Sequence, residues 1–151
     1  MNIFQHQTCK FNALDVGLVG RRDTAFRKMV NFACHRAMVA SGIPLEKLDE
    51  MNPGIAFFSL RGDENWPAKW VRETTAGHRV RPSDFEGIVH NSAPGYSSIQ
   101  LHLTGPQIAL VGGDIRVAAD LQILAGRSRF MIVCTATPNE AAAYALEAID
   151  E

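Results

Sequence analysis

The sequence has few cysteines and no ordered spacing among its cysteines and histidines. Cys9, Cys34 and Cys134 are the only cysteines in 151 residues. An odd number of widely spaced cysteines with apolar neighbours matches neither a disulfide framework nor a zinc-binding spacing. We therefore predict three free cysteines in the core. The five histidines include no HxxxH or HxH pair, so the sequence indicates no metal site, and it indicates no cofactor.

The chain also lacks an excess of positive charge and a long apolar run. Its 15 Lys and Arg residues oppose 16 Asp and Glu residues, for a formal net charge of −1. That balance gives no basic field for nucleic acid or an anionic membrane. No apolar stretch approaches the ~20 residues that span a bilayer, and the N-terminus has no secretory signal pattern. We expect a single globular domain in the cytoplasm.

The first forty residues predict a strand and a helix. Residues 2–11 carry weak apolar alternation and are expected to form a first strand. Asp23 or Thr24 can cap a helix that runs to about Ser41, because each offers a side-chain oxygen to the free N–H groups of a first turn. Apolar side chains recur along this segment at spacings of three and four. Gly42 is expected to end the helix.

The middle of the chain predicts a buried strand followed by a long loop. Gly54–Leu60 is a short apolar run between Pro53 and Gly62, which is typical of a strand buried on both faces. Residues 61–89 are polar and rich in tryptophan, glycine and proline, so we expect a long loop that contains a short helix. Residues 93–103 are expected to form another helix.

The last third predicts strands alternating with helices. Residues 107–111 form a strand, a glycine pair turns the chain, and a helix runs from Asp114 to about Ala125. Residues 129–135 are another buried strand, and the alanine-rich segment Asn139–Ile149 is expected to form a final helix. Such alternation predicts an α/β fold with a mixed βαβ sheet covered by helices.

The helix that follows Asp114 is apolar on nearly every side. Between residues 115 and 125 its polar side chains are Arg116, Asp120 and Gln122, and the first two form an i,i+4 pair. A helix on one face of a sheet normally has a broad polar back, so this helix is expected to be covered on two sides. Either another subunit or the expected final helix supplies the second cover, and the sequence favours neither.

Residues 83–99 resemble a segment of ketosynthases of the thiolase superfamily. Ketosynthases carry an SP-x-x-F segment, an N-x-x-[AP]-G-x-x-[SA]-I helix, a GP pair, a strand and the turn that bears the nucleophile. The same order occurs here, with Asn91–Ile99 and Gly105–Pro106. The resemblance covers roughly residues 20–135. The form V-H-N-S-A-P-G-Y-S-S-I, with the later G-D-x-x-x-A-A-x-L, resembles chain-length-factor-like homologues of aryl-polyene-type pigment and fatty-acid-like pathways.

The resemblance implies a thiolase-like half-fold, with residues 1–151 as one N-terminal-half-like domain and the C-terminal half-domain absent. It places Asp114 where the family has its nucleophilic cysteine. A condensing enzyme needs a thiolate there, at a helix N-terminus that lowers the thiol pKa. An aspartate in that place can cap the helix but is a poor acyl carrier. The family's two active-site histidines belong to the C-terminal half, and neither His90 nor His102 corresponds to them.

The resemblance therefore implies a non-catalytic subunit. It would be a homodimer, or a heterodimer with a ketosynthase, and would act as a chain-length-factor-like partner or scaffold in polyketide or fatty-acid-like biosynthesis. Two alternatives stay open: an acyl-thioester-processing enzyme that uses Asp114 as acid or base, and a module that binds acyl groups or acyl carrier protein. The candidate interface and substrate-tunnel residues are His90, Asn91, Tyr96, Asp114 and Arg116.

Overall fold

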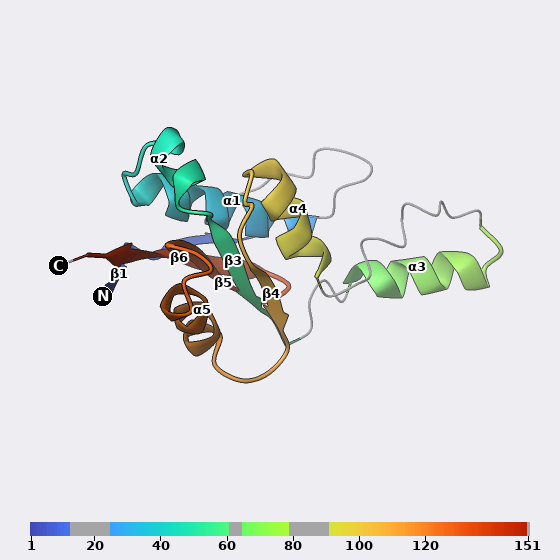
Figure 1. Ribbon diagram of the computed structural model, residues 1–151. Coiled ribbons are helices and arrows are strands. Elements are labelled where there is room, and N and C mark those ends of the chain that lie inside the picture. The colour runs from blue at the N-terminus through green and yellow to red at the C-terminus, as the bar shows by residue number, and fades with distance from the viewer. Residues whose placement is uncertain (13–24, 61–64, 79–90, 151) are drawn as a thin grey trace.

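The computed structural model describes four stretches of the chain (Figure 1), which are residues 1–12, 25–60, 65–78 and 91–150. The loop expected after residue 12, the helix cap at Asp23 or Thr24, and His90 lie outside these residues.

A mixed β-sheet forms the centre of the described chain. Its strand order is β1-β6-β5-β3-β4, and β2 pairs with β6 as well. Strands β3, β4 and β5 are parallel to one another, whereas β6 runs antiparallel to β5, β1 and β2. The bounds are β1 (Asn2–Gln5), β2 (Cys9–Asn12), β3 (Gly54–Phe58), β4 (Gln107–Leu110), β5 (Phe130–Ala136) and β6 (Glu140–Ile149).

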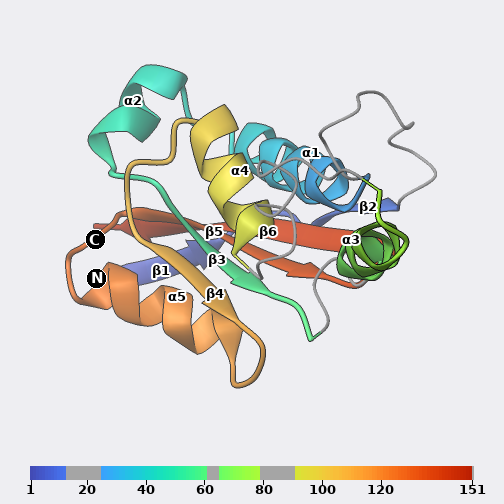
Figure 2. The same ribbon diagram turned by 90° about the vertical axis from the view of Figure 1, so that its right-hand side faces the viewer.

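Helices cover both faces of this sheet (Figure 2). Helices α1 and α4 lie on one face and α5 lies on the other, while α3 extends away from the sheet (Figure 1). The bounds are α1 (Ala25–Ala40), α2 (Leu45–Glu50), α3 (Asn65–Thr75), α4 (Ser92–Gln100) and α5 (Ile115–Leu124). Among the described helices, none combines the length and apolarity that a membrane crossing needs.

The sheet separates two apolar cores. The core under α1 and α4 is the larger, and Phe57, Phe130 and Ile132 of the sheet meet α1 in it. The core under α5 contains Met131 and Val133 of β5. Because alternate residues of β3 and β5 enter opposite cores, these two strands are buried on both faces, which is why each reads as a continuous apolar run.

The expected final helix, Asn139–Ile149, is wrong, because this segment contains strand β6. β6 pairs with β5 from Ala136↔Ala141 to Phe130↔Glu147, and β1 and β2 occupy its other edge. The helix preference of alanine is worth only a fraction of a kcal/mol per residue, on the order of 0.5. Here the strand satisfies its backbone on two sides and buries side chains in both cores, so tertiary pairing outweighs local preference.

The other expected elements are close to those observed. The first helix ends as expected at a glycine in the left-handed region, Gly42, with φ of +69°. The expected strand 2–11 is two strands, β1 and β2, because the chain leaves the edge of β6 between Gln5 and Cys9. No sequence pattern predicted α2. The α/β class and the mixed, helix-covered sheet are confirmed.

Candidate functional site

A strand–turn–helix unit carries the residue that the sequence singles out. Val111 and two glycines connect the end of β4 to the N-cap of α5. Gly113 has φ of +83°, where residues with a Cβ are strained. Asp114 follows as the N-cap of α5, as predicted. Its Oδ1 accepts hydrogen bonds from the backbone N–H groups of Arg116 at 2.9 Å and Val117 at 3.3 Å.

This geometry defines what Asp114 can do chemically. The side chain is exposed, and one carboxylate oxygen accepts both hydrogen bonds. Both donors belong to the first turn of α5, so the hydrogen bonds of this oxygen are made within the helix that Asp114 caps. Asp114 therefore stabilises the first turn of α5. It places a carboxyl group, and no thiol, at the N-terminus of this helix.

Replacing Asp114 with alanine is expected to destabilise the chain by about 1 kcal/mol, within the 0.5–2 kcal/mol typical of lost N-caps. Urea unfolding followed by circular dichroism measures the change. Asp114→Asn is the matched control, because asparagine caps about as well as aspartate. An alanine variant as stable as the wild type would show that the cap contributes nothing.

Arg116 ties the start of α5 to the N-terminal strand. Its Nε donates to Asp120 Oδ1 at 2.9 Å, which confirms the predicted i,i+4 pair, and its Nη1 donates to Gln5 Oε1 at 2.6 Å. Burial opposes the charge, but the hydrogen bond and charge of Asp120, with a contribution from Tyr144, raise the pKa of Arg116. Arg116 is therefore a fixed cation that links α5, β1 and β6.

Tyr144 belongs to this cluster although no sequence pattern pointed to it. It lies on β6, the strand that was expected to be a helix, and it packs at the edge of the core under α5. Burial raises the pKa of Tyr144, Arg116 opposes that shift, and the charges of Asp120 and Asp114 reinforce it. The phenol is consequently held neutral.

The Tyr144 phenol is expected to titrate above its ordinary value of about 10. The chain has two tyrosines, so phenolate absorbance of a Tyr96→Phe variant isolates Tyr144. The unfolded phenol loses its proton first as pH rises, so this contribution to stability is complete below pH ~10 and is lost as pH rises through the folded pKa. A midpoint at or below that of free tyrosine would contradict the expected shift.

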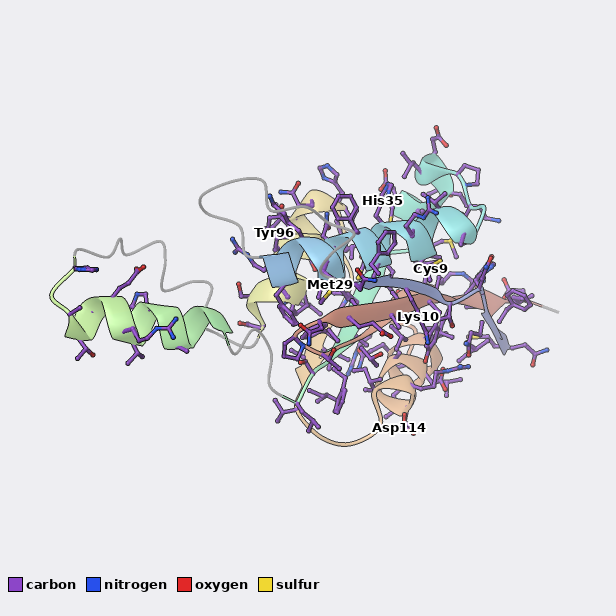
Figure 3. The ribbon with its side chains drawn as sticks, turned by 180° about the vertical axis from the view of Figure 1, so that it is seen from behind. Cys9, Lys10, Met29, His35, Tyr96 and Asp114 are labelled. Atoms are coloured by element: carbon purple, nitrogen blue, oxygen red, sulfur yellow. The ribbon has the colours of Figure 1, made fainter. Side chains whose placement is uncertain are left out.

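Asn91 and Tyr96, the other predicted site residues in the described part of the chain, do not join this cluster. Asn91 precedes α4, is exposed and makes no side-chain cap hydrogen bond. Tyr96 lies on α4, where the Arg27 guanidinium carbon is 5.0 Å from its ring centroid. Figure 3 shows Tyr96 and Asp114 on opposite sides of the sheet. The structure therefore brings Asp114 and Arg116 together and places Asn91 and Tyr96 elsewhere.

The cysteines are free thiols, and two of them have core roles. Cys34 and Cys134 are buried as predicted, whereas Cys9 is partly exposed. A hydrogen bond with Cys134, followed by burial, raises the pKa of the Cys34 thiol. Within the described ranges, no group of three or more His, Cys, Asp or Glu side chains is placed to hold a metal ion.

An apolar stripe runs along the outer side of α5. Val117, Leu121 and Leu124 are 51%, 56% and 59% exposed, and their spacing places them on one face of the helix. The opposite face, with Ala119 and Ile123, is buried against the sheet. One of the two covers expected for this helix, a final helix at residues 139–149, is wrong, because that segment contains β6. We call Val117, Leu121 and Leu124 the α5 stripe.

A small cavity of about 280 Å³ opens at the carboxyl ends of β3 and β5. Its lining is mainly apolar, and the hydroxyl of Thr137 in its wall already interacts with the backbone of Asn139 and Glu140. The lining residues are Phe58, Ser59, Leu60, Ala136, Thr137 and Pro138.

Comparison with solved structures identifies the fold. The chain matches a chain of the complex between a ketosynthase and its chain length factor from Xenorhabdus doucetiae, with 12% identity, a TM-score of 0.62, and coverage of 82% of this chain and 57% of that one. It matches a beta-ketoacyl synthase from Burkholderia phymatum with 13% identity, a TM-score of 0.69, and coverage of 83% and 42%.

A third match is to a type II polyketide synthase assembly in which an acyl carrier protein is bound to its ketosynthase, with 16% identity, a TM-score of 0.62, and coverage of 82% and 46%. No family model and no curated protein matches the chain. The chain spans 42% to 57% of the lengths of the three solved chains that it matches. At these identities the likeness concerns the fold, and the chain has the thiolase-like α/β fold of ketosynthases.

Proposed function

We propose that this chain is a non-catalytic ketosynthase-like subunit that pairs with a ketosynthase or with a second copy of itself. The observation that carries the proposal is Asp114 at the N-terminus of α5. In the family that the sequence resembles, this position holds the thiol that carries the acyl group. Here the carboxylate accepts two hydrogen bonds from its own helix, so it supports the structure of the turn and offers no acyl-carrying sulfur.

The α5 stripe supports the pairing part of the proposal. Its three aliphatic side chains are each more than half exposed. Burying such a side chain fully is worth about 1.5–3 kcal/mol, and a contiguous apolar patch of this kind is typical of interaction surfaces. The stripe therefore gives the chain a surface that a partner subunit would stabilise.

The open edge of the sheet supports pairing as well. Among the described strands, β4 pairs with β3 and has no partner on its other edge. A strand of another chain can extend a sheet at an edge strand. β4 leads directly into the turn before α5, so the edge and the α5 stripe belong to consecutive elements.

The solved relatives suggest which partners to test. One match comes from a ketosynthase bound to its chain length factor, and another from a ketosynthase bound to an acyl carrier protein. By analogy, we assign this chain to polyketide or fatty-acid-like biosynthesis, with a ketosynthase as the first candidate partner and an acyl carrier protein as the second. The chain would act as one ketosynthase N-terminal-like domain in this role.

An acyl-thioester enzyme that uses Asp114 as acid or base has weaker support. One oxygen of the Asp114 carboxyl group already accepts two backbone hydrogen bonds from its own helix. The neighbouring phenol of Tyr144 is held neutral, and the neighbouring guanidinium of Arg116 is a permanent cation. The group therefore matches a structural cap better than a proton-transfer pair.

Native mass spectrometry of the purified chain, alone and mixed with a ketosynthase from the same genome, tests the proposal. A one-to-one complex with the ketosynthase is expected, or a homodimer that persists in the mixture. A monodisperse monomer under both conditions would refute pairing. Condensation of acyl and malonyl thioesters by the chain alone would refute the non-catalytic assignment.

A further inference from the structure

Two thiols meet in the core under α1 and α4. Cys34 lies on α1 and Cys134 lies on β5, the middle strand of the sheet. Both cysteines are 0% exposed and belong to the same apolar core. Their side chains are hydrogen-bonded to each other, so the two sulfur atoms are in contact where the helix packs on the sheet.

Alanines lie beside both cysteines. Ala33 and Ala37 are on the buried face of α1, and Ala143 of β6 is the register partner of Cys134. All three alanines are 0% exposed. A disulfide requires α-carbons about 4.4–6.8 Å apart, so a helix and a sheet can share one only where their backbones come close. Small side chains next to the pair favour that approach.

We propose that Cys34 and Cys134 are a redox-sensitive pair, which a small disulfide such as oxidised glutathione converts into a disulfide bridge. The thiolate of one cysteine attacks a sulfur of oxidised glutathione, which forms a mixed disulfide and releases one glutathione thiolate. The thiolate of the other cysteine attacks the protein sulfur of the mixed disulfide and releases the second glutathione. The two cysteine protons pass to the two glutathione thiolates, so two thiols are oxidised and one glutathione disulfide is reduced.

The native packing controls when this reaction occurs. The thiolate is the reactive form of a cysteine, and the hydrogen bond with Cys134, followed by burial, raises the pKa of the Cys34 thiol. Neither cysteine has an exposed surface that glutathione can reach. The first attack therefore requires α1 to move away from β5, and the pair reacts through local opening of the helix.

The bridge locks α1 onto the sheet. It closes a loop of about 100 residues, and disulfides that close long loops restrict the unfolded chain most strongly. Helix α1 and helix α5 cover opposite faces of the sheet (Figure 2). The redox state of the pair therefore acts on a different part of the molecule from the proposed pairing through the α5 stripe.

The test uses Cys9→Ser, because Cys9 is the third cysteine and is partly exposed. The reduced variant is incubated with oxidised glutathione in buffer and in urea below its unfolding midpoint, and its intact mass is measured. The expected product has lost the mass of two hydrogen atoms, and it forms faster as urea opens α1. Its urea midpoint should exceed that of the protein reduced with dithiothreitol by about 1 M or more.

Cys9→Ser/Cys34→Ala and Cys9→Ser/Cys134→Ala are the matched controls, because each keeps one thiol of the pair. Each should gain at most one glutathione, with no rise in its urea midpoint. If a control does not fold, tryptic mapping of the oxidised wild type must still show Cys34 linked to Cys134. A chain that stays reduced at every urea concentration below the midpoint, a reaction that stops at the mixed disulfide, or a bridge that lowers the urea midpoint would overturn the proposal.

Discussion

Leu121→Asp is expected to abolish assembly with the partner subunit, whether that partner is a ketosynthase or a second copy. Leu121 is the middle member of the α5 stripe, with Val117 one turn before it and Leu124 one turn after it. An aspartate at the centre of an apolar contact would be buried without a partner charge, and central interface substitutions commonly cost 2 kcal/mol or more. We expect the dissociation constant to rise by about a hundredfold or more.

Leu45→Asp is the matched control for this variant. Leu45 lies on α2 and is 67% exposed, comparable with Leu121 at 56%. Both variants should unfold near the wild-type urea concentration, because neither side chain is buried in the described chain. Titration by native mass spectrometry should show assembly retained in Leu45→Asp. An unchanged dissociation constant in Leu121→Asp would exclude the α5 stripe as the interface, while leaving pairing through β4 to be tested separately.

Phe57→Ala is expected to destabilise the fold by about 3–5 kcal/mol, the range for truncating a buried phenylalanine. Phe57 lies in β3, is fully buried, and packs edge-to-face with Phe26 of α1 at a centroid distance of 6.3 Å. Its removal leaves a cavity where the sheet meets α1. In a domain of this size, a loss of that order approaches the whole stability, since domains are stable by roughly 5–15 kcal/mol.

Phe32→Ala provides the comparison for Phe57→Ala. The side chain is the same, but on α1 it is 44% exposed, so the expected loss is below about 1 kcal/mol. Urea unfolding measures both variants under the same conditions. If the two losses were equal, the core under α1 and α4 would not be the main source of stability.

The sequence predicted the elements whose burial pattern or local chemistry can be read from their own residues. β3 and β5 were found because strands buried on both faces read as apolar runs, and α1 was found because one broad face packs on the sheet. The N-cap at Asp114 was found because its chemistry is local. The glycine turn before it was found for the same reason, since Gly113 adopts a conformation that few other residues share.

β6 was missed for a physical reason. Its alanines suit a helix when taken alone, but Ala141, Ala143 and Ala145 are small side chains on the face toward α1, and the strand is paired on both edges. Neither fact can be read from residues 140–149 by themselves, because both depend on β1, β2 and β5. Tyr144 was missed with the strand that carries it. The sequence alone therefore could not predict that Tyr144, Arg116 and Gln5 lie together.

The position of β6 affects the order in which the chain can fold during synthesis. Asn2 pairs with Ile149 and Cys9 pairs with Ala143, so β1 and β2, which are synthesised before β6, must wait for β6 before they find their strand partner. The parallel strands β3, β4 and β5 can associate earlier. Contacts between residues this far apart in the sequence slow folding, and partly folded chains with unpaired strand edges tend to aggregate. The exposed edge of β5 is vulnerable until β6 closes it.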